Sequence, residues 1–286
     1  MTSATVAAFP SNPWKRVGWI ALAAYVVYAC AQLDVSVDRV ASGWHNAAHF
    51  LARLFPPNFG RWELLLKGLK ESLEIAVLAS TLGIVLSLPI GFVAARNLMP
   101  AWISWPARLL IVGCRSFHPV IVAILFVKAV GFGALAGILA LTVASIGFIG
   151  KLFAEAIEEI SLKQVEAVRA TGAPFMSVIA FGVLPQVFAR FIGFCTYQLD
   201  SNLRNSTMVG IVGAGGIGGT LFAAFQRFDY DYVCAILISI IALIMVGELL
   251  AMGVRAIFID GLSLAELFRG RVGRLAARGE RPLEDD

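Results

Sequence analysis

The chain has 286 residues, of which 59% are hydrophobic and only 15% are charged, and its mean hydropathy is +0.81. Soluble domains are about half apolar and about one quarter charged, so this composition argues against a soluble enzyme or a disordered protein. The net charge of +4 is too sparse to indicate a nucleic-acid-binding surface, although the sequence pI is near 9.0.

Six apolar stretches are long enough to cross a bilayer, which takes about 20 residues of α-helix. We therefore expect an all-α membrane protein with six transmembrane helices. In chain order, the expected spans are 17–33, 73–95, 107–130, 133–150, 187–212 and 232–259. The expected regions are 1–72 (N-terminal tail, first helix and outer connecting segment), 73–260 (core with five helices) and 261–286 (Arg-rich cytoplasmic tail).

The first span has a second interpretation. Lys15 and Arg16 precede an uncharged run that contains Ala29-Cys30-Ala31, an order also typical of a signal peptide or lipoprotein box. We favour an uncleaved helix because further apolar stretches follow. The connecting segment 34–72 contains an amphipathic stretch, Trp62–Lys67, which we expect to lie at the membrane interface. The connections on one side of the six expected spans, together with both termini, carry more Lys and Arg than the connections on the other side. Because cytoplasmic segments are enriched in Lys and Arg, this predicts that both termini are cytoplasmic.

No metal site or disulfide is expected. The four cysteines fall in or beside different apolar stretches without a CxxC pair, so they are expected to be small buried residues. His45 and His49 lie four residues apart and can share a helix face, but the pattern offers no third ligand beside them.

Residues 151–185, between the fourth and fifth spans, are the most informative part of the chain. Ile157, Ile160 and Val165 recur at helical spacing among charged residues, which predicts an amphipathic helix. Gly172 can end that helix, and Pro174 suits the first turn of a second short helix. The segment is therefore expected to form a helix, a sharp turn and another helix close to the membrane.

This segment resembles the EAA loop of permease subunits in ABC importers, whose pattern is Glu-Ala-Ala, three residues, Gly, nine residues, Ile, one residue, Leu-Pro. Glu166-Ala167-Val168 and Gly172 keep the first spacing, and Leu184-Pro185 keeps the second. Val168 replaces the second Ala, and Gly182 stands at the Ile position. The resemblance implies a coupling helix that docks on a cytoplasmic ATPase. Its coupling residues would be Glu166, Ala167, Gly172, Leu184 and Pro185.

Five further segments resemble the permeases of phosphonate importers; they are 89–97, 115–119, 131–137, 202–207 and 209–218. His118-Pro119 and Asp200 depart from the commoner pattern of that family, and phosphite and hypophosphite permeases share the pattern. The resemblance implies a type I importer permease that moves phosphonate, phosphite or a related phosphorus oxyanion by alternating access.

The resemblance also implies the partners. They are a second copy of the chain, two cytoplasmic ABC ATPase subunits that bind ATP and Mg, a periplasmic or lipid-anchored substrate-binding protein, and the lipid of a bacterial inner membrane. No nucleic-acid partner is expected. Gly150-Lys151 is the nearest approach to a Walker A motif, but Ser145 and Leu152 occupy positions that require Gly and Ser or Thr. We therefore expect no catalytic residue and no cofactor in this chain.

Polar side chains interrupt the third and fifth spans. The candidate pathway residues are Arg115, His118, Asp200, Asn202, Arg204 and Asn205. Charges are costly in hydrocarbon, so they should face the bundle interior, a partner or water. Asp200 and Arg204 can pair on one helix face, and Pro119 predicts a kink beside Arg115. A purely structural role for these residues is an equal alternative.

Residues 213–218 fit the pattern GxGxxG, but they follow a membrane helix instead of a strand. We therefore expect tight helix packing or a broken helix near the outer mouth. Other functions remain open at this point: an ion-coupled secondary transporter, an importer of a different small solute such as an amino acid, or a membrane enzyme. An enzyme would need a partner for His118, and none is near it in the sequence.

Overall fold

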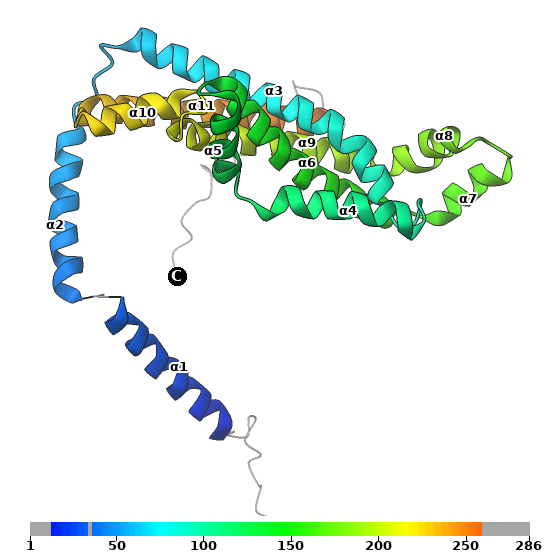
Figure 1. Ribbon diagram of the computed structural model, residues 1–286, viewed down its shortest axis with the longest axis horizontal. Helices are drawn as coiled ribbons and strands as arrows, with labels where there is room; N and C mark the ends of the chain where they lie inside the picture. The colour runs from blue at the N-terminus through cyan, green and yellow to red at the C-terminus, as the bar shows by residue number, and fades with distance from the viewer. Residues whose placement is uncertain (1–12, 34–35, 259–286) are drawn as a thin grey trace, which may run out of the picture. The chain divides into compact units, whose positions relative to one another are not determined.

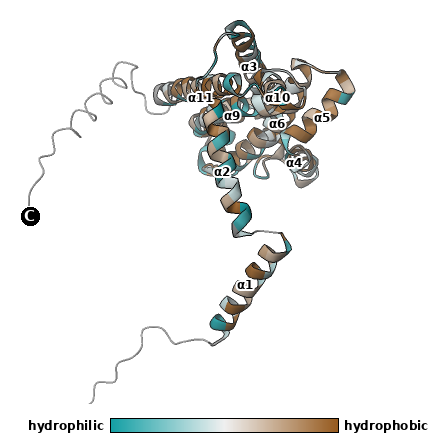
Figure 2. Cartoon of the chain, turned by 90° about the vertical axis from the view of Figure 1, so that its left-hand side faces the viewer, coloured by the Kyte–Doolittle hydropathy of each residue, from teal (hydrophilic) through white to brown (hydrophobic). Residues whose placement is uncertain are grey.

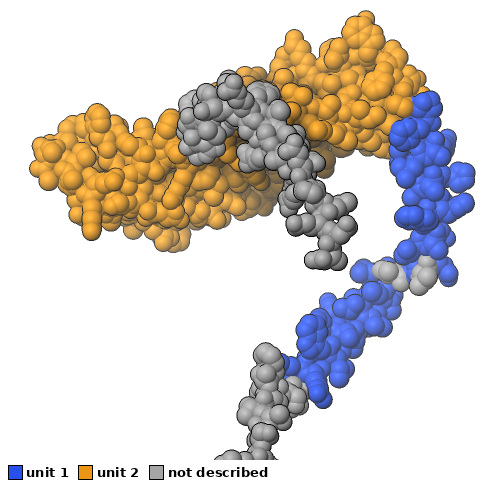
Figure 3. Space-filling view, turned by 180° about the vertical axis from the view of Figure 1, so that it is seen from behind, with its two compact units in different colours: residues 1–56 blue, residues 57–286 orange. Residues whose placement is uncertain are grey.

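The computed structural model describes residues 13–33 and 36–258, and every regular element in these ranges is helical. The chain divides into two compact units, 1–56 and 57–286, drawn in blue and orange in Figure 3. The expected Arg-rich tail, 261–286, lies outside the described residues.

The described residues of the first unit form the helices α1 (Pro13–Gln32) and α2 (Val37–Leu54). Ser36 caps α2 by accepting a hydrogen bond from the Arg39 amide at 3.3 Å. Hydrophilic and hydrophobic residues alternate around α2 (Figure 2), which is the pattern of an amphipathic helix. His45 and His49 lie one turn apart on it, and their rings meet edge to face with centroids 5.3 Å apart.

Four helical segments in residues 57–258, the described part of the second unit, are long and apolar enough to cross a membrane. They are α3 (Trp62–Ala94), α6 (Ala134–Glu158), the continuous segment Phe175–Ile211, and Tyr230–Arg255 of α11 (Tyr230–Phe258). A fifth span is broken into α4 (Ala101–Ser116) and α5 (Pro119–Val130), which meet at 91°. The first expected span, 17–33, lies in α1, and α1 is not among the described helices that are apolar enough to cross a membrane. Lys15 and Arg16 in its first turn lower its mean hydropathy.

The start of α3 differs from the expectation. Trp62–Lys67 is not a separate interfacial helix but the first turns of the same 33-residue helix that crosses the membrane. Leu65 in these turns is buried, and Gly68 brings the helix so close to Ile217 that a Cβ at Gly68 would lie 3.1 Å from the Ile217 Cα atom. Packing against α10 (Ile217–Gln226) therefore keeps the helix continuous where local polarity suggested a boundary.

The core of the second unit is built around α6, which packs against α3, α4, α5 and α9 (Leu184–Ile211) (Figure 1). The helices α3 and α6 approach each other closely, because Gly83 touches Ser145 and Gly91 touches Phe153. Small residues allow two helix backbones to approach closely, and in a bilayer such packing is a main source of helix association.

The segment after α6 forms a helix, a turn and a helix, as predicted, with different boundaries. Ile157 belongs to α6 and is fully buried, so the predicted amphipathic helix is wrong as one unit: a break at 159–161 separates α6 from α7 (Leu162–Ala170). Gly172 then adopts a φ of +75°, which favours glycine, and ends the turn. α8 (Phe175–Val178) and the π-helix η1 (Ile179–Val183) lead without interruption into α9. In Figure 1, α7 and α8 project from one end of the bundle.

Candidate functional site

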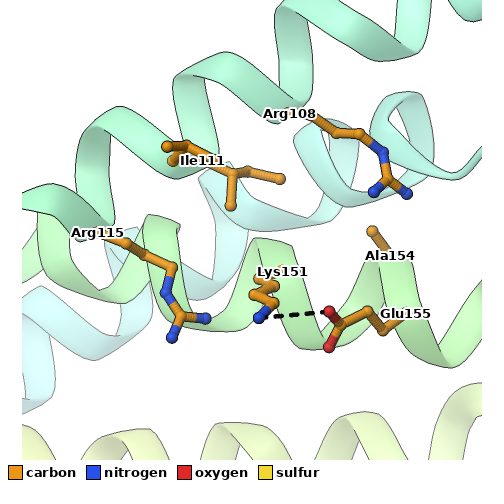
Figure 4. Close-up of a pocket in the computed structure, with 7 residues that line it drawn as sticks. Arg108, Ile111, Arg115, Lys151, Ala154 and Glu155 are labelled. Atoms are coloured by element: carbon orange, nitrogen blue, oxygen red, sulfur yellow. Dashed lines mark ion pairs between the residues drawn. The ribbon is translucent and has the colours of Figure 1, made fainter.

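A cleft between α4 and α6 gathers three cations. Arg108, Ile111 and Arg115 follow one another at spacings of three and four residues, which places them on one face of α4. Lys151, Ala154 and Glu155 line the facing side of the cleft from α6 (Figure 4). Gly147 brings the two helices together, because a Cβ there would lie 2.8 Å from the Cγ atom of Arg115.

The three cations of this cleft differ in their partners. The Arg108 guanidinium pairs with Glu158 at 2.5 Å and donates to the Ala94 carbonyl at 2.9 Å. The Lys151 ammonium lies 3.5 Å from the Glu155 carboxylate, in a pair that is about half exposed. Arg115 is exposed and makes no ion pair with any residue that the structure describes. Within residues 13–33 and 36–258, the cleft therefore has one positive charge that no carboxylate balances.

The expected pathway residues do not gather in one pocket. Arg115 lines the cleft between α4 and α6, whereas Asp200, Asn202, Arg204 and Asn205 lie on α9. Asp200 and Arg204 form an ion pair of 2.6 Å across one turn, as their spacing predicted. Asp200 is mostly buried, and its Oδ1 atom has no hydrogen-bond partner in the described part of the chain. The side chain of Asn205 donates a long hydrogen bond, 3.4 Å, to Ser201.

Asn202 lies inside the bundle, at the centre of a buried polar cluster. Its Nδ2 atom donates to the hydroxyls of Ser80 on α3 and Ser145 on α6, at 2.9 and 2.8 Å. Its Oδ1 atom accepts from Gln198, one turn earlier on α9, at 3.0 Å, and Gln198 also donates to Ser145 at 2.9 Å. All four residues are at least 96% buried. These uncharged groups tie α3, α6 and α9 together.

His118 occupies the corner between α4 and α5. Its Nδ1 atom accepts a hydrogen bond from the Val120 amide at 3.3 Å and caps α5, with Pro119 in the first turn. The predicted kink is a full break here, because Phe117 and His118 have extended backbone with ψ near 140°. A residue before proline avoids the helical conformation, which explains why α4 cannot run through the corner.

The residues of the EAA-like loop are placed as a compact hairpin of helices. Glu166 and Ala167 are exposed on α7, while Val165 is 98% buried against the loop. Leu184 and Pro185 begin α9. Gln186 closes the hairpin by accepting from the Ser161 amide at 3.0 Å and donating to the Gly182 carbonyl at 2.6 Å.

Gly182 stands where the family pattern has Ile, and the packing of the loop gives a reason. A Cβ atom at Gly182 would lie 3.3 Å from the Cα atom of Val165. Because Gly182 has no side chain, α7 packs directly on η1. The departure from the family pattern is therefore compatible with a compact hairpin.

The glycine-rich stretch breaks a helix, which confirms that interpretation of residues 213–218. Gly213, Gly215 and Gly216 have φ between +81° and +87°, in the loop that separates α9 from α10. The loop is held by the Gly133 amide, which donates to the Gly213 carbonyl at 3.0 Å, and by Ser72, which accepts from the Ile217 amide at 2.9 Å.

Several polar residues of these two sites were not singled out from the sequence as site residues. They are Arg108, Lys151 and Glu155 of the cleft and Ser80, Ser145 and Gln198 of the cluster. One signal was available: Arg108 and Arg115 are seven residues apart, so they share a helix face. Serines in apolar helices carry no such signal, because a lone Ser can also bond its own helix.

Comparisons with known proteins agree with this architecture. Residues 87–263 match the family described as the binding-protein-dependent transport system inner membrane component. The chain is 38% identical over 234 residues to the phosphite transport system permease protein PtxC of Stutzerimonas stutzeri, covering 81% of this chain and 85% of that protein. It is 37% identical over 253 residues to the phosphate-import permease protein PhnE of Mycolicibacterium smegmatis, covering 86% and 48%.

A solved structure is also similar. The chain superimposes with a TM-score of 0.60 on a chain of the MetNI methionine ABC transporter in an inward-facing conformation. The match has 25% identity and covers 70% of this chain and 98% of that chain.

Proposed function

Because the chain belongs to the inner membrane components of binding-protein-dependent transport systems, we propose that it imports phosphonate, phosphite or a related phosphorus oxyanion. The observation that carries this proposal is the 38% identity to a phosphite permease over most of both chains. Methionine import is favoured less, since identity to the methionine transporter is 25% over a smaller part of the chain. An ion-coupled mechanism is not favoured by the family.

The proposed assembly supplies what the chain lacks. ATP and Mg would bind to two cytoplasmic ATPase subunits, and a binding protein outside the inner membrane would deliver the solute. A second copy of the chain would complete the path, because four or five spans leave little room for a polar route inside one protomer. Both termini would face the cytoplasm, and the membrane subunit itself would do no covalent chemistry.

The hairpin of α7 and α8 is proposed to dock on the ATPase. It projects from the end of the bundle, presents Glu166 and Ala167 to solvent, and is fixed to α9 through Gln186 (Figure 1). Because the hairpin is joined to α9, a movement of the bound ATPase can be transmitted through it to the helices of the bundle. Alternating access would then follow from rocking of the bundles as the ATPases close.

Co-purification tests the assembly, and a stimulated ATPase assay tests the solute. The chain is expected to co-purify with an ABC ATPase encoded by the same organism. In proteoliposomes with the matching binding protein, ATP hydrolysis should rise with a phosphonate, phosphite or phosphate and not with methionine. Stimulation by methionine alone, or failure to associate with any ATPase, would overturn the proposal.

Two substitutions test the docking hairpin. Glu166→Ala removes an exposed carboxylate that makes no intramolecular ion pair within the described residues, and Gly172→Ala strains a left-handed backbone by about 1 kcal/mol. Each should weaken ATPase association about fivefold in a pull-down titration, consistent with loss of an interface contact of about 1 kcal/mol. Arg227→Gln, an exposed charge at the end of α10 and outside the hairpin, serves as the charge-changing control. Normal association and normal stimulated hydrolysis in both variants would refute the assignment of the hairpin.

A further inference from the structure

The cleft between α4 and α6 has a charge arrangement that the packing of the helices does not require. Arg108 is committed to Glu158 and to a backbone carbonyl, and Lys151 is shared with Glu155. Arg115 adds a third cation without a carboxylate of its own among the described residues. Around it, the cleft wall is apolar, formed by Ile111 and Val112.

The Arg115 guanidinium, unpaired within the described residues, lies within a broken membrane span, where its charge is energetically costly unless a polar group or water contacts it. A charged side chain within a membrane-spanning segment is costly, so such residues face water, protein or a ligand. Arg115 lines this cleft and reaches from α4 towards Lys151 on α6 (Figure 4). The two cationic groups thus converge on the same open space.

The chemistry of the converging groups selects an anion with several oxygens. A guanidinium offers planar paired donors that match two oxygens of one phosphate-like group, and an ammonium adds a third donor with its own charge. Arg108 lies two helical turns from Arg115, about 10 Å along the axis of α4, and its bond to Glu158 fixes it as a wall of the cleft. Glu155 limits the positive charge, which favours a ligand that can leave again.

We propose that the α4–α6 cleft is a binding site for a tetrahedral phosphorus oxyanion, held by Arg115 and Lys151. Lys151 and Glu155 lie in the last two turns of α6, shortly before the α7–α8 hairpin. The Lys151 side of the cleft therefore faces the hairpin end of the bundle, where a transported oxyanion would pause before release. That role rests on the proposed function; an anionic phospholipid headgroup offers the same chemistry as a second source.

Phosphorus-31 NMR on the full-length chain tests the site without any transport step. The chain is reconstituted in nanodiscs of phosphatidylcholine, and phosphite is titrated while its line width and shift are followed. Wild-type protein should broaden the phosphite signal in a saturable manner. Arg115→Gln should weaken phosphite at least tenfold, and Lys151→Gln about fivefold. Arg227→Gln, an exposed arginine at the end of α10, is the matched control and should bind as wild type does.

A second arm distinguishes the two sources of the oxyanion. In nanodiscs that contain phosphatidylglycerol, native mass spectrometry should show that lipid retained by wild type and released by Arg115→Gln if the headgroup is the ligand. Phosphite binding in phosphatidylcholine discs that persists when phosphatidylglycerol is added identifies the free oxyanion. Equal phosphite binding and equal lipid retention in wild type and both cleft variants, with unchanged helical circular dichroism, would overturn the proposal.

The outcome is separable from that of the proposed function. Oxyanion-stimulated ATP hydrolysis with no difference between wild type and the cleft variants in the NMR titration would refute the site and leave the importer intact. Saturable binding in the cleft together with hydrolysis stimulated only by an unrelated solute would support the site and refute the substrate class.

Discussion

Two polar regions use different faces of α6 and treat their polar groups in opposite ways. The cluster of Ser80, Ser145, Gln198 and Asn202 is uncharged, buried and internally hydrogen-bonded. The α4–α6 cleft carries full charges, is open to its surroundings, and leaves Arg115 without an ion-pair partner among the described residues. The neutral cluster holds the helices together, whereas the cleft leaves the Arg115 guanidinium available to bind a ligand.

The difference follows from the cost of burying each kind of group. A neutral amide or hydroxyl that is satisfied inside a bundle costs little, and a buried charge needs a partner or water. In this chain the uncharged polar groups lie where three helices meet, and the charges lie in the cleft between two helices. Helix packing and ligand binding therefore use different regions. Substitutions in the two regions should affect different measurements, and this can be tested.

The largest expected effect is at Gly83, beside the neutral cluster. Gly83→Val would place a branched side chain against Ser145, at the contact where α3 and α6 approach most closely. Overpacking of this kind typically costs 1–3 kcal/mol, and we expect about 3 kcal/mol in the free energy of unfolding by sodium dodecyl sulfate. Leu82→Val, at an exposed neighbour, is the control. A stability equal to that of the control would mean that the α3–α6 contact is not tight.

A smaller loss is expected at the centre of the cluster. Asn202→Leu keeps the approximate volume but removes the amide that joins Ser80, Ser145 and Gln198, so buried polar atoms lose partners. We expect a loss of about 2 kcal/mol in the same unfolding titration, against less than about 0.5 kcal/mol for Arg115→Gln in the cleft. If the two variants were equally destabilised, the contrast between the regions would be false.

The smallest effect is expected at Glu155 and should appear in binding rather than in stability. Glu155→Gln removes the carboxylate beside Lys151, and the exposed pair it breaks contributes little to folding. Phosphite affinity should rise about threefold in the phosphorus-31 titration, since one nearby repulsion is gone. Glu159→Gln, which breaks the exposed pair with Arg190, is the matched control. Weaker phosphite binding in Glu155→Gln would contradict a cationic site.

Local sequence patterns predicted the helices better than their breaks. The spans are readable because uninterrupted apolar runs have few alternatives in a membrane. The beginning of α3 was not readable from the sequence. Its first turns are polar enough to suggest an interfacial helix, but in the structure they continue into the span and pack against α10. At the corner after α4, Pro119 predicted a kink, while the extended backbone of Phe117 and His118 turned it into two helices.

The sites divide in the same manner. The pair of Asp200 and Arg204 was predictable because four residues separate them on one helix. The surroundings of Asn202 were not, since its partners Ser80 and Ser145 are 122 and 57 residues away in the chain. Arg115 was recognised as a costly charge, but its association with Lys151 depends on how α4 lies on α6, which is a property of tertiary packing.

The corner between α4 and α5 has a mechanical consequence. No helical hydrogen bond runs through Phe117, so the angle between the two halves can change without the loss of any such bond. The segment Phe175–Ile211 is continuous over about 55 Å, and near its start it carries the π-helix η1 instead of an extended break. The helix α4, which forms one wall of the cleft, therefore ends at a hinge. Its angle to α6 can change while α5 stays packed in the core.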